Sequence, residues 1–326
     1  MTRVLDRVRG RGAFVLRILV SIALLGAVLA YADFGDVAQV VRDGEWGWLL
    51  VAGALMAVCV VVGALRWWLL LEGAGIDLPA RRSIRPYALS FVLNLVLPTA
   101  FAGDAVRTWV VGKRSGRLLG ATAATVVDKL TALACLFALG WVVYAFDREV
   151  VPDSVIVAFA WVTGGLVAAG ILAALAAAGV RPVVHRLPER AALVIRDSWR
   201  MLRVWAGSRS LVASVTALGF AYQALVIGVF VFVGKAVGLE LAFALAAVST
   251  AVVLVATLIP VSVGGVGIRE GGFVLLLGQA GIDAADATVL SLLSAVTVLV
   301  TSAAVAGATY VSDYLRAGEA KTSPVP

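Results

Sequence analysis

The sequence predicts an all-α, polytopic membrane protein of about seven or eight transmembrane helices, folded as a single membrane domain over residues 1–326. Of its 326 residues 62% are hydrophobic and only 14% are charged, whereas soluble domains carry about 25% charged residues. The hydrophobic residues form long continuous runs, which excludes a transmembrane barrel with alternating strands. Two segments rich in proline and glycine interrupt these runs and predict re-entrant or broken helices related as internal repeats.

The first half of the chain contains three predicted spans, over about residues 14–32, 46–71 and 118–146. Arginines precede the first span, the loop Asp33–Glu45 is acidic, and the next loop carries Arg81, Arg82 and Arg85. Because cytoplasmic loops are rich in lysine and arginine, this order places the N-terminus in the cytoplasm. Residues 86–103 are uncharged but have basic residues on both sides. We therefore expect both ends of this segment in the cytoplasm and a re-entrant hairpin between them.

The second half contains four further apolar segments, over about residues 154–179, 210–234, 241–258 and 287–312. Residues 181–209 carry seven arginines. Over about 187–205 the arginines share one side of a helix and apolar residues the other, which predicts an interfacial helix on the inner leaflet rather than a nucleic-acid site. Residues 259–282 either cross the membrane as a broken helix, with a cytoplasmic C-terminus, or re-enter and leave the tail outside. The sequence leaves both open.

The two interruptions share one spacing. Pro98-x4-Gly103-x3-Arg107 recurs as Pro260-x4-Gly265-x3-Arg269, 162 residues later. Proline removes a backbone donor and glycine permits positive φ, so both segments are expected to break helical continuity. In lipid, a broken backbone survives only where protein buries it or water reaches it. This recurring spacing predicts two internal repeats, over about residues 47–146 and 210–312.

Charged side chains at membrane depth cost about 2.5–3.5 kcal/mol each on insertion, so they are functional candidates. The predicted lipid-headgroup site comprises Asn94, Pro98, Gly103, Asp104, Arg107, Asp128, Lys129, Pro260, Gly264, Gly265, Gly267, Arg269 and Glu270. Broken helices point free N–H groups into a cavity, and arginine adds a fork of donors suited to phosphate. We expect Arg107 and Arg269 to bind the phosphate, and Asp104, Asp128 and Glu270 to orient them or contact the headgroup. The alternative is that Asp128-Lys129 and Arg269-Glu270 only neutralise one another or face a loop.

Signatures of soluble enzymes are scarce. The chain has one histidine, His185, and neither Gly-x-Ser-x-Gly nor a P-loop. Cys59 and Cys135 lie in apolar runs without metal-ligand spacing, so we expect small buried hydrophobes. Gly264-Gly265-x-Gly267 follows no predicted strand, which argues against a dinucleotide site. We expect no metal and no cofactor. We also expect no nucleic-acid partner, because the net charge of +7 comes from loops beside apolar spans.

An ordered set of motifs runs through residues 14–315: Leu65-Arg66-Trp67, Asn94-Leu95-x2-Pro98-x4-Gly103-Asp104-x2-Arg107, Val127-Asp128-Lys129-Leu130, and Pro260-x3-Gly264-Gly265-x-Gly267-x-Arg269-Glu270. In this set the chain resembles the lysylphosphatidylglycerol synthase transmembrane-region (flippase-like) family. It departs from that family at Thr99-Ala100-Phe101-Ala102, where glycines are usual, and at Asp128-Lys129, where Asp-Arg is usual.

The resemblance implies a membrane domain that moves lipids between leaflets, with two repeats containing re-entrant segments. In full-length aminoacyl-lipid synthases a cytosolic transferase domain follows, and this chain stops at Pro326, so we expect no synthase activity. Some relatives are associated with polyprenol-linked glycan assembly, which keeps a role in that pathway open.

We therefore expect a lipid flippase or transporter-like protein of the inner (plasma) membrane, not an enzyme. Its partner would be an anionic phospholipid or a polyprenyl phosphate. One alternative is a membrane-embedded enzyme, or enzyme partner, acting on a polyprenyl-phosphate sugar with Asp104 or Asp128 as acid/base. Another is a scaffold that packs with other membrane proteins. A homo-oligomer, or an enzyme of lipid or glycan synthesis as partner, stays open.

Overall fold

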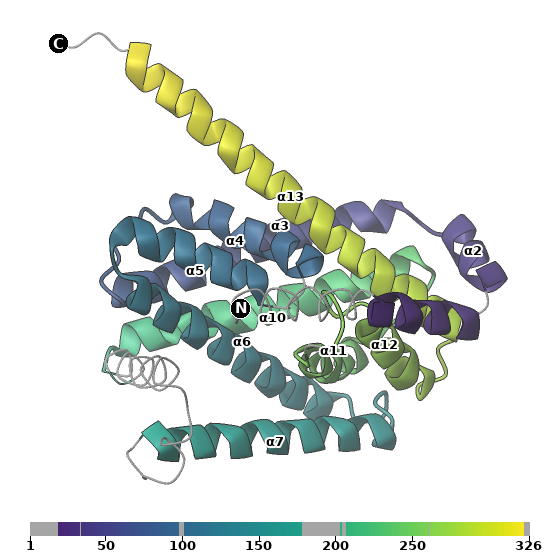
Figure 1. The fold of residues 1–326 in the computed structure, drawn as a ribbon. Coiled ribbons are helices and arrows are strands. Elements are labelled where there is room, and N and C mark those ends of the chain that lie inside the picture. The colour runs from purple at the N-terminus through teal and green to yellow at the C-terminus, as the bar shows by residue number, and fades with distance from the viewer. Residues whose placement is uncertain are drawn as a thin grey trace, which may run out of the picture.

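The computed structural model describes residues 19–32, 34–97, 101–177, 203, 207–259 and 261–322, and all regular structure in this part of the chain is helical. The predicted all-α polytopic class is confirmed (Figure 1). Five helices are long and apolar enough to cross a membrane: α3 (Gly47–Gly73), α6 (Leu118–Phe146), α7 (Asp153–Ala177), α10 (Arg209–Ala236) and α13 (Ala284–Thr322). The helix Leu19–Tyr31 and α2 (Phe34–Asp43) are bent by 80° and form either a sixth, broken span or a re-entrant loop.

Two helical hairpins lie between the long helices, and the second accounts for the difference from the seven or eight spans expected. The first joins α4 (Arg81–Val96) to α5 (Ala102–Ser115), and the second joins α11 (Phe243–Thr257) to α12 (Ile268–Gly278). These helices have 16, 14, 15 and 11 residues, whereas a span needs about 20. The second hairpin replaces the predicted span 241–258 and the segment 259–282.

Glycine determines both hairpins. In the second, Gly264, Gly265 and Gly267 have φ of 60°, 76° and 85°, which no right-handed helix contains, so the chain between α11 and α12 cannot continue either helix. In the first, a Cβ on Gly103 would overlap the carbonyl oxygen of Ser90. Only glycine therefore lets α4 and α5 approach this closely.

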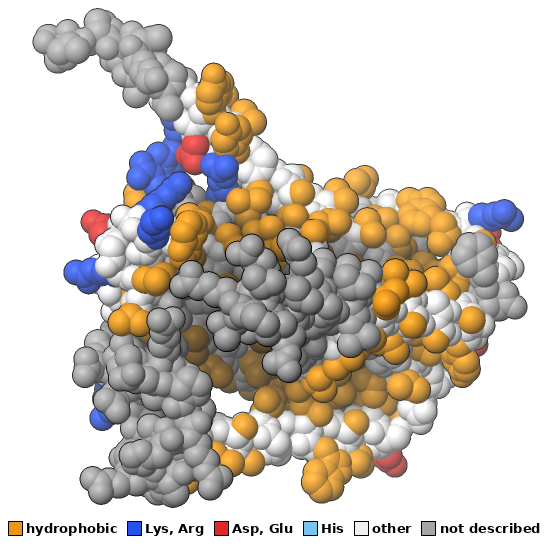
Figure 2. Space-filling model, in the orientation of Figure 1, with side chains coloured by type: hydrophobic (Ala, Val, Ile, Leu, Met, Phe, Trp, Pro, Cys, Tyr) orange, Lys and Arg blue, Asp and Glu red, His pale blue; other side chains and the backbone are white. Residues whose placement is uncertain are grey.

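The base of the first hairpin lies at what we call the basic end, which carries Arg81, Arg82, Arg85, Lys113, Arg114 and Arg117. Arg117 donates to the carbonyl oxygen of Ala74 at 3.4 Å, which places the end of α5 beside the end of α3. Late in α13, Asp313 pairs with Arg81 at 3.9 Å, so this part of α13 lies at the same end. Most basic side chains visible in Figure 2 gather there, and hydrophobic side chains make up much of the remaining coloured surface.

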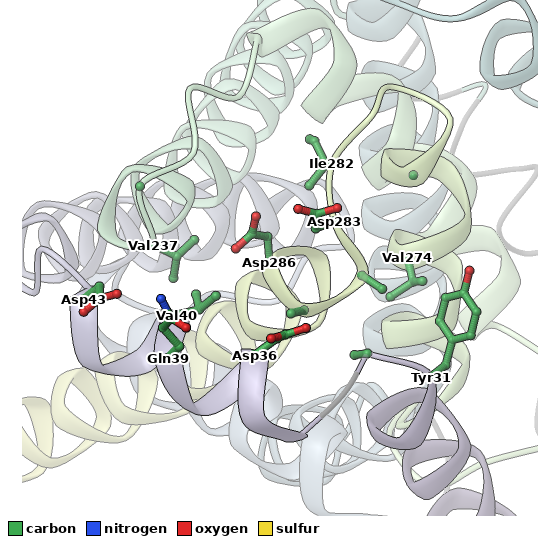
Figure 3. A pocket seen from close by; sticks show the side chains of 15 residues that line it. Tyr31, Asp36, Gln39, Val40, Asp43, Val237, Val274, Ile282, Asp283 and Asp286 are labelled. Atoms are coloured by element: carbon green, nitrogen blue, oxygen red, sulfur yellow. The ribbon is translucent and has the colours of Figure 1, made fainter.

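The opposite, acidic end holds the base of the second hairpin. The N–H of Glu45, just before α3, donates to the carbonyl oxygen of Ala236 at the end of α10. One cavity at this end is lined by residues of α2, the turn after α10, the end of α12 and the start of α13 (Figure 3). Since α3 has 27 residues, or about 40 Å, the two hairpins enter the bundle from opposite ends.

The tips of the hairpins meet inside the bundle. A Cβ on Gly264 would lie 2.6 Å from the carbonyl oxygen of Leu95, near the end of α4. The second hairpin, residues 243–278, thus leaves the acidic end and returns to it as a whole. As a result, α13 starts at the acidic end and ends at the basic end. The structure answers the question left open by residues 259–282: the late part of α13 lies beside the basic loops.

The order long helix, hairpin, long helix occurs twice, as α3 to α6 and as α10 to α13. The repeat boundaries of about 47–146 and 210–312 stay a prediction. The amphipathic helix expected over about 187–205 lies outside the described residues, except for Arg203. Cys59 and Cys135 are buried and free, as predicted.

Candidate functional site

Asp128 of α6 is the centre of a buried charge network. Its Oδ1 lies 2.7 Å from Nη2 of Arg66, which comes from α3. Its Oδ2 lies 2.8 Å from Nη2 of Arg107, which comes from α5. All three side chains are 1% exposed. One carboxylate therefore joins two guanidinium groups and ties the first hairpin to both neighbouring long helices.

Asp104 extends the network toward the surface. It lies one turn before Arg107 on α5, and its Oδ1 is 3.0 Å from Nη2 of that arginine. Its Oδ2 accepts from the ammonium of Lys129 at 2.9 Å and from the amide of Asn94 at 3.1 Å. Lys129 is 43% exposed, in contrast to its neighbours. We call Arg66, Asn94, Asp104, Arg107, Asp128 and Lys129 the Asp128 network.

Asn94 connects the two arms of the first hairpin. Its side-chain oxygen accepts the N–H of Gly103 at 2.7 Å, while its amide donates to Asp104. The first N–H groups of a helix have no partner within it, so Asn94 supplies one for α5 from α4. The tip of the hairpin thereby holds Asp104 in place.

Aromatic rings surround the two arginines. The guanidinium carbon of Arg107 lies 4.6 Å from the ring centre of Trp67 and 4.4 Å from that of Tyr87. That of Arg66 lies 5.0 Å from the ring centre of Tyr222. Cation–π attraction of this kind stabilises a desolvated guanidinium. The rings hold the arginines in place but bring no negative charge.

The Asp128 network carries an excess positive charge. Three cations, Arg66, Arg107 and Lys129, face two carboxylates, those of Asp104 and Asp128. Three buried nitrogens have no hydrogen-bond acceptor among the described residues: Nη1 of Arg66, and Nε and Nη1 of Arg107. Buried donors are nearly always paired, so each exception calls for an explanation such as a water or an ion. An excess cation with free donors is the electrostatic arrangement of an anion site.

The second motif forms a separate and locally neutral pair. The carboxylate of Glu270 is fully buried and accepts from Nε of Arg269 at 3.0 Å. It also accepts from the N–H of Gly267 at 2.6 Å, which caps the start of α12. Ser291 of α13 lies 3.3 Å from Arg269 and 3.4 Å from Glu270. Here the cation and the anion match one to one.

The predicted site residues therefore fall into two groups. The first motif contributes Asn94, Gly103, Asp104 and Arg107 to one network, and the separate pair Asp128-Lys129 joins the same network. The second contributes Gly267, Arg269 and Glu270 to the other group, while Gly264 touches Leu95 and Gly265 lies against Thr257. Pro98 and Pro260 lie outside the described residues.

Arg107 and Arg269 pair with different carboxylates: Arg107 with Asp104 and Asp128, and Arg269 with Glu270. Neither arginine lines the cavities that we describe. Asp128 and Lys129 do not neutralise one another either, because each pairs with a residue from α3 or α5. Arg269 and Glu270 do pair with each other.

The family model described as the lysylphosphatidylglycerol synthase TM region matches residues 14–306, a range that contains both hairpins and both charged groups. The chain belongs to this family. No curated protein matches the chain. Membership makes the chain a multi-pass membrane protein of a family connected with lipid-related processes.

Arg66 is the site residue that sequence reasoning missed in this lysylphosphatidylglycerol synthase TM-region protein. Arginine and tryptophan near the end of a predicted span usually lie at headgroup level. Arg66 does not, because it is buried against Asp128 and α3 continues to Gly73. A signal was present: Arg66 is the single charged residue between Gly47 and Leu71. Tyr222 packs under Arg66, whereas Gln223 donates to the carbonyl oxygen of Ala132 at 2.6 Å.

The acidic end of this family member contains a cavity of about 870 Å³ (Figure 3). Asp36 and Asp43 reach it from α2, and Asp283 and Asp286 from the start of α13. It contains none of the predicted site residues. The chain thus keeps its acidic cavity at one end and its cationic network between the first hairpin and the long helices.

Proposed function

We propose that the chain binds the phosphate of a membrane-lipid headgroup at the Asp128 network and moves that lipid between the two leaflets. The protein would be a flippase or transporter-like protein of the inner membrane with a cytoplasmic N-terminus. The observation that carries the proposal is the excess positive charge of the Asp128 network together with three buried guanidinium nitrogens that lack an acceptor.

Phosphate suits these donors better than other anions do. Guanidinium groups bind phosphate through parallel N–H bonds, and such charge-assisted bonds are about twice as strong as neutral ones. A lipid phosphodiester carries one negative charge, which equals the excess on the network. An anionic phospholipid and a polyprenyl phosphate share this chemistry, so the experiment below compares them.

The arrangement of the hairpins supports transport. Two returning segments enter the bundle from opposite ends and touch at Gly264 and Leu95. Transporters with inverted repeats place their sites at such broken helices. The basic end would face the cytoplasm by the positive-inside rule.

A catalytic role has less support. Asp104 and Asp128 are the carboxylates that an enzyme acting on a polyprenyl-phosphate sugar would need as acid or base. Each already has both carboxylate oxygens paired with cations, so neither has an oxygen left to contact a substrate. Turnover of a lipid-linked sugar by the purified protein would favour the enzyme.

The decisive test compares Arg107→Lys with wild type in proteoliposomes. The lysine keeps the charge but removes the fork. Since hydrogen bonds to charged groups contribute about 1.5–3 kcal/mol, we expect at least a tenfold slower loss of headgroup accessibility for labelled anionic lipid. Arg81→Lys, at an exposed pair with Asp313, is the matched control and should leave the rate unchanged. Equal rates of lipid movement in Arg107→Lys and wild type, with both proteins folded, would refute the proposal.

Parallel arms identify the lipid and the role of the second motif. Labelled phospholipids with anionic and zwitterionic headgroups, and a labelled polyprenyl phosphate, are supplied to the same vesicles. The Asp128 network predicts movement of one or both of the lipids with a net negative headgroup and little movement of the zwitterion. Arg269→Lys tests the other group: because Arg269 is already matched by Glu270, we expect a smaller effect than for Arg107→Lys.

A further inference from the structure

A groove of about 480 Å³ runs between α5 and α6 beside the Asp128 network. Its walls are apolar and include Phe101, Trp109, Leu118 and Leu130, and its charged lining residues are Asp104 and Lys129. Phe101, Trp109 and Leu130 are 45%, 53% and 53% exposed. The volume lies within the range of about 300–1,000 Å³ typical of ligand sites. In a membrane protein, such exposed apolar walls face the acyl chains of the bilayer.

Lys129 places a cation at unusual depth in this groove. It stands eleven positions after Leu118, the first residue of α6, or about 16 Å along the helix axis. Half of a hydrocarbon core of about 30 Å is comparable, so Lys129 lies near the bilayer centre. There a lysine costs about 2.5–3.5 kcal/mol, and yet its side chain is 43% exposed. An exposed cation at this depth is poorly explained by packing alone.

The groove also has a cation at its rim. Lys113, in the last turn of α5, holds its ammonium 4.9 Å from the ring centre of Trp109. The groove therefore runs from a basic rim at the basic end, past Trp109, to Lys129. A phosphate that moves inward along it finds a positive charge at both ends.

We propose that this groove is the lateral entry site for an anionic phospholipid from the leaflet at the basic end, a proposal that rests on the proposed function. One acyl chain lies along Trp109 and Leu130, and the phosphate binds Lys129. Lys129 then exchanges the carboxylate of Asp104 for the phosphate, while Asp104 keeps Arg107 and Asn94 as partners. Charge complementarity favours this occupant: the Asp128 network has one cation in excess, and the walls are apolar.

The test uses the fluorescence of Trp109 and phospholipids with brominated acyl chains, which quench tryptophan on contact. The Trp109 signal is the difference between wild type and Trp109→Phe in vesicles of defined composition. We expect at least twofold stronger quenching by brominated anionic lipid than by brominated zwitterionic lipid at equal mole fraction. Trp161 of α7, which is 79% exposed, is measured in the same way through Trp161→Phe and should show no preference.

Two lysine variants locate the headgroup. Lys129→Met should abolish the preference at Trp109, and Lys129→Arg should restore it. Lys113→Met should weaken it less than Lys129→Met does. A preference that depends on Lys113 and not on Lys129 would place the headgroup at the rim and overturn the inference. Equal quenching by the two lipids would overturn it as well, and so would a Trp109 that neither lipid quenches, because a protein partner would then cover the groove.

The transport assay separates this inference from the proposed function. A preference at Trp109 that depends on Lys129, in vesicles that show no lipid movement, would support the groove and refute transport. Lipid movement without any preference at Trp109 would do the reverse.

Discussion

Arg66 of α3 donates to Asp128 of α6 at 2.7 Å, with both side chains 1% exposed and 62 positions apart in the chain. Neither charge can reach water or the headgroup layer, so each depends on the other for compensation. Arg107 shares the same carboxylate from α5. The position of the first hairpin therefore depends on one carboxylate and two arginines.

Asp128→Asn should destabilise the protein strongly. The amide leaves two buried guanidinium groups without their shared anion, and breaking a buried pair in this way costs about 3–5 kcal/mol. Thermal unfolding in detergent measures the effect. Asp147→Asn, at an exposed position after α6, is the control. Equal unfolding temperatures for the two variants would show that Asp128 does not hold the network together.

Gly264→Ala should be more harmful than Gly116→Ala. Both glycines have positive φ, 60° and 68°, so both alanines bear a backbone cost of about 1–2 kcal/mol. At Gly116 no atom lies within 4 Å of the added Cβ, whereas at Gly264 the carbonyl oxygen of Leu95 lies 2.6 Å away. The excess loss of stability measures the contact between the hairpin tips. Equal losses would mean that the tips can separate without cost.

Glu270→Gln should cost less than Asp128→Asn. Glutamine keeps a side-chain oxygen for the N–H of Gly267, so the start of α12 remains capped. The ion pair with Arg269 is lost, but Arg269 is 19% exposed and can reach water or headgroups, unlike the two arginines around Asp128. Unfolding temperatures of the two variants, measured side by side, test this order. A larger loss for Glu270→Gln would reveal that the second motif is the more tightly coupled one.

The sequence predicted the class, the first hairpin and most of the network, because charge, proline and glycine within apolar runs are local signals. It could not predict which charges pair. Asp128 and Lys129 are adjacent in the chain, yet their partners come from α3 and α5. Only tertiary packing brings these together. Arg66 was not predicted as a site residue, because the apolar run alone placed it at the end of the span.

The second hairpin shows another limit. The chain is uncharged from Leu241 to Ile268, so hydrophobicity alone favours a full span there. Three glycines, Gly264, Gly265 and Gly267, cause the break, because their positive φ prevents α11 from continuing. Whether such a break returns or crosses depends on where the following helix packs. Here Gly272 of α12 lies against Val253 of α11, which makes the pair a hairpin.

The side of the membrane on which each end lies can be read with single cysteines. The native Cys59 and Cys135 are buried, so they should not react with a membrane-impermeant maleimide. Glu149→Cys, in the loop before α7, and Ser115→Cys, at the base of the first hairpin, are exposed positions at opposite ends. In intact cells stripped of any outer barrier, Glu149→Cys should be labelled at once. Ser115→Cys should be labelled only after permeabilisation.

Ser312→Cys, late in α13, decides the path of the second hairpin. Asp313 pairs with Arg81, and Tyr310 lies under the guanidinium of Arg85 at 4.6 Å. These contacts place the end of α13 beside the base of the first hairpin. Ser312→Cys should therefore behave like Ser115→Cys and stay unlabelled until permeabilisation. Labelling together with Glu149→Cys would mean that α11 and α12 do not return to the side where they began. The path between two opposed hairpins, on which the transport proposal depends, would then be absent.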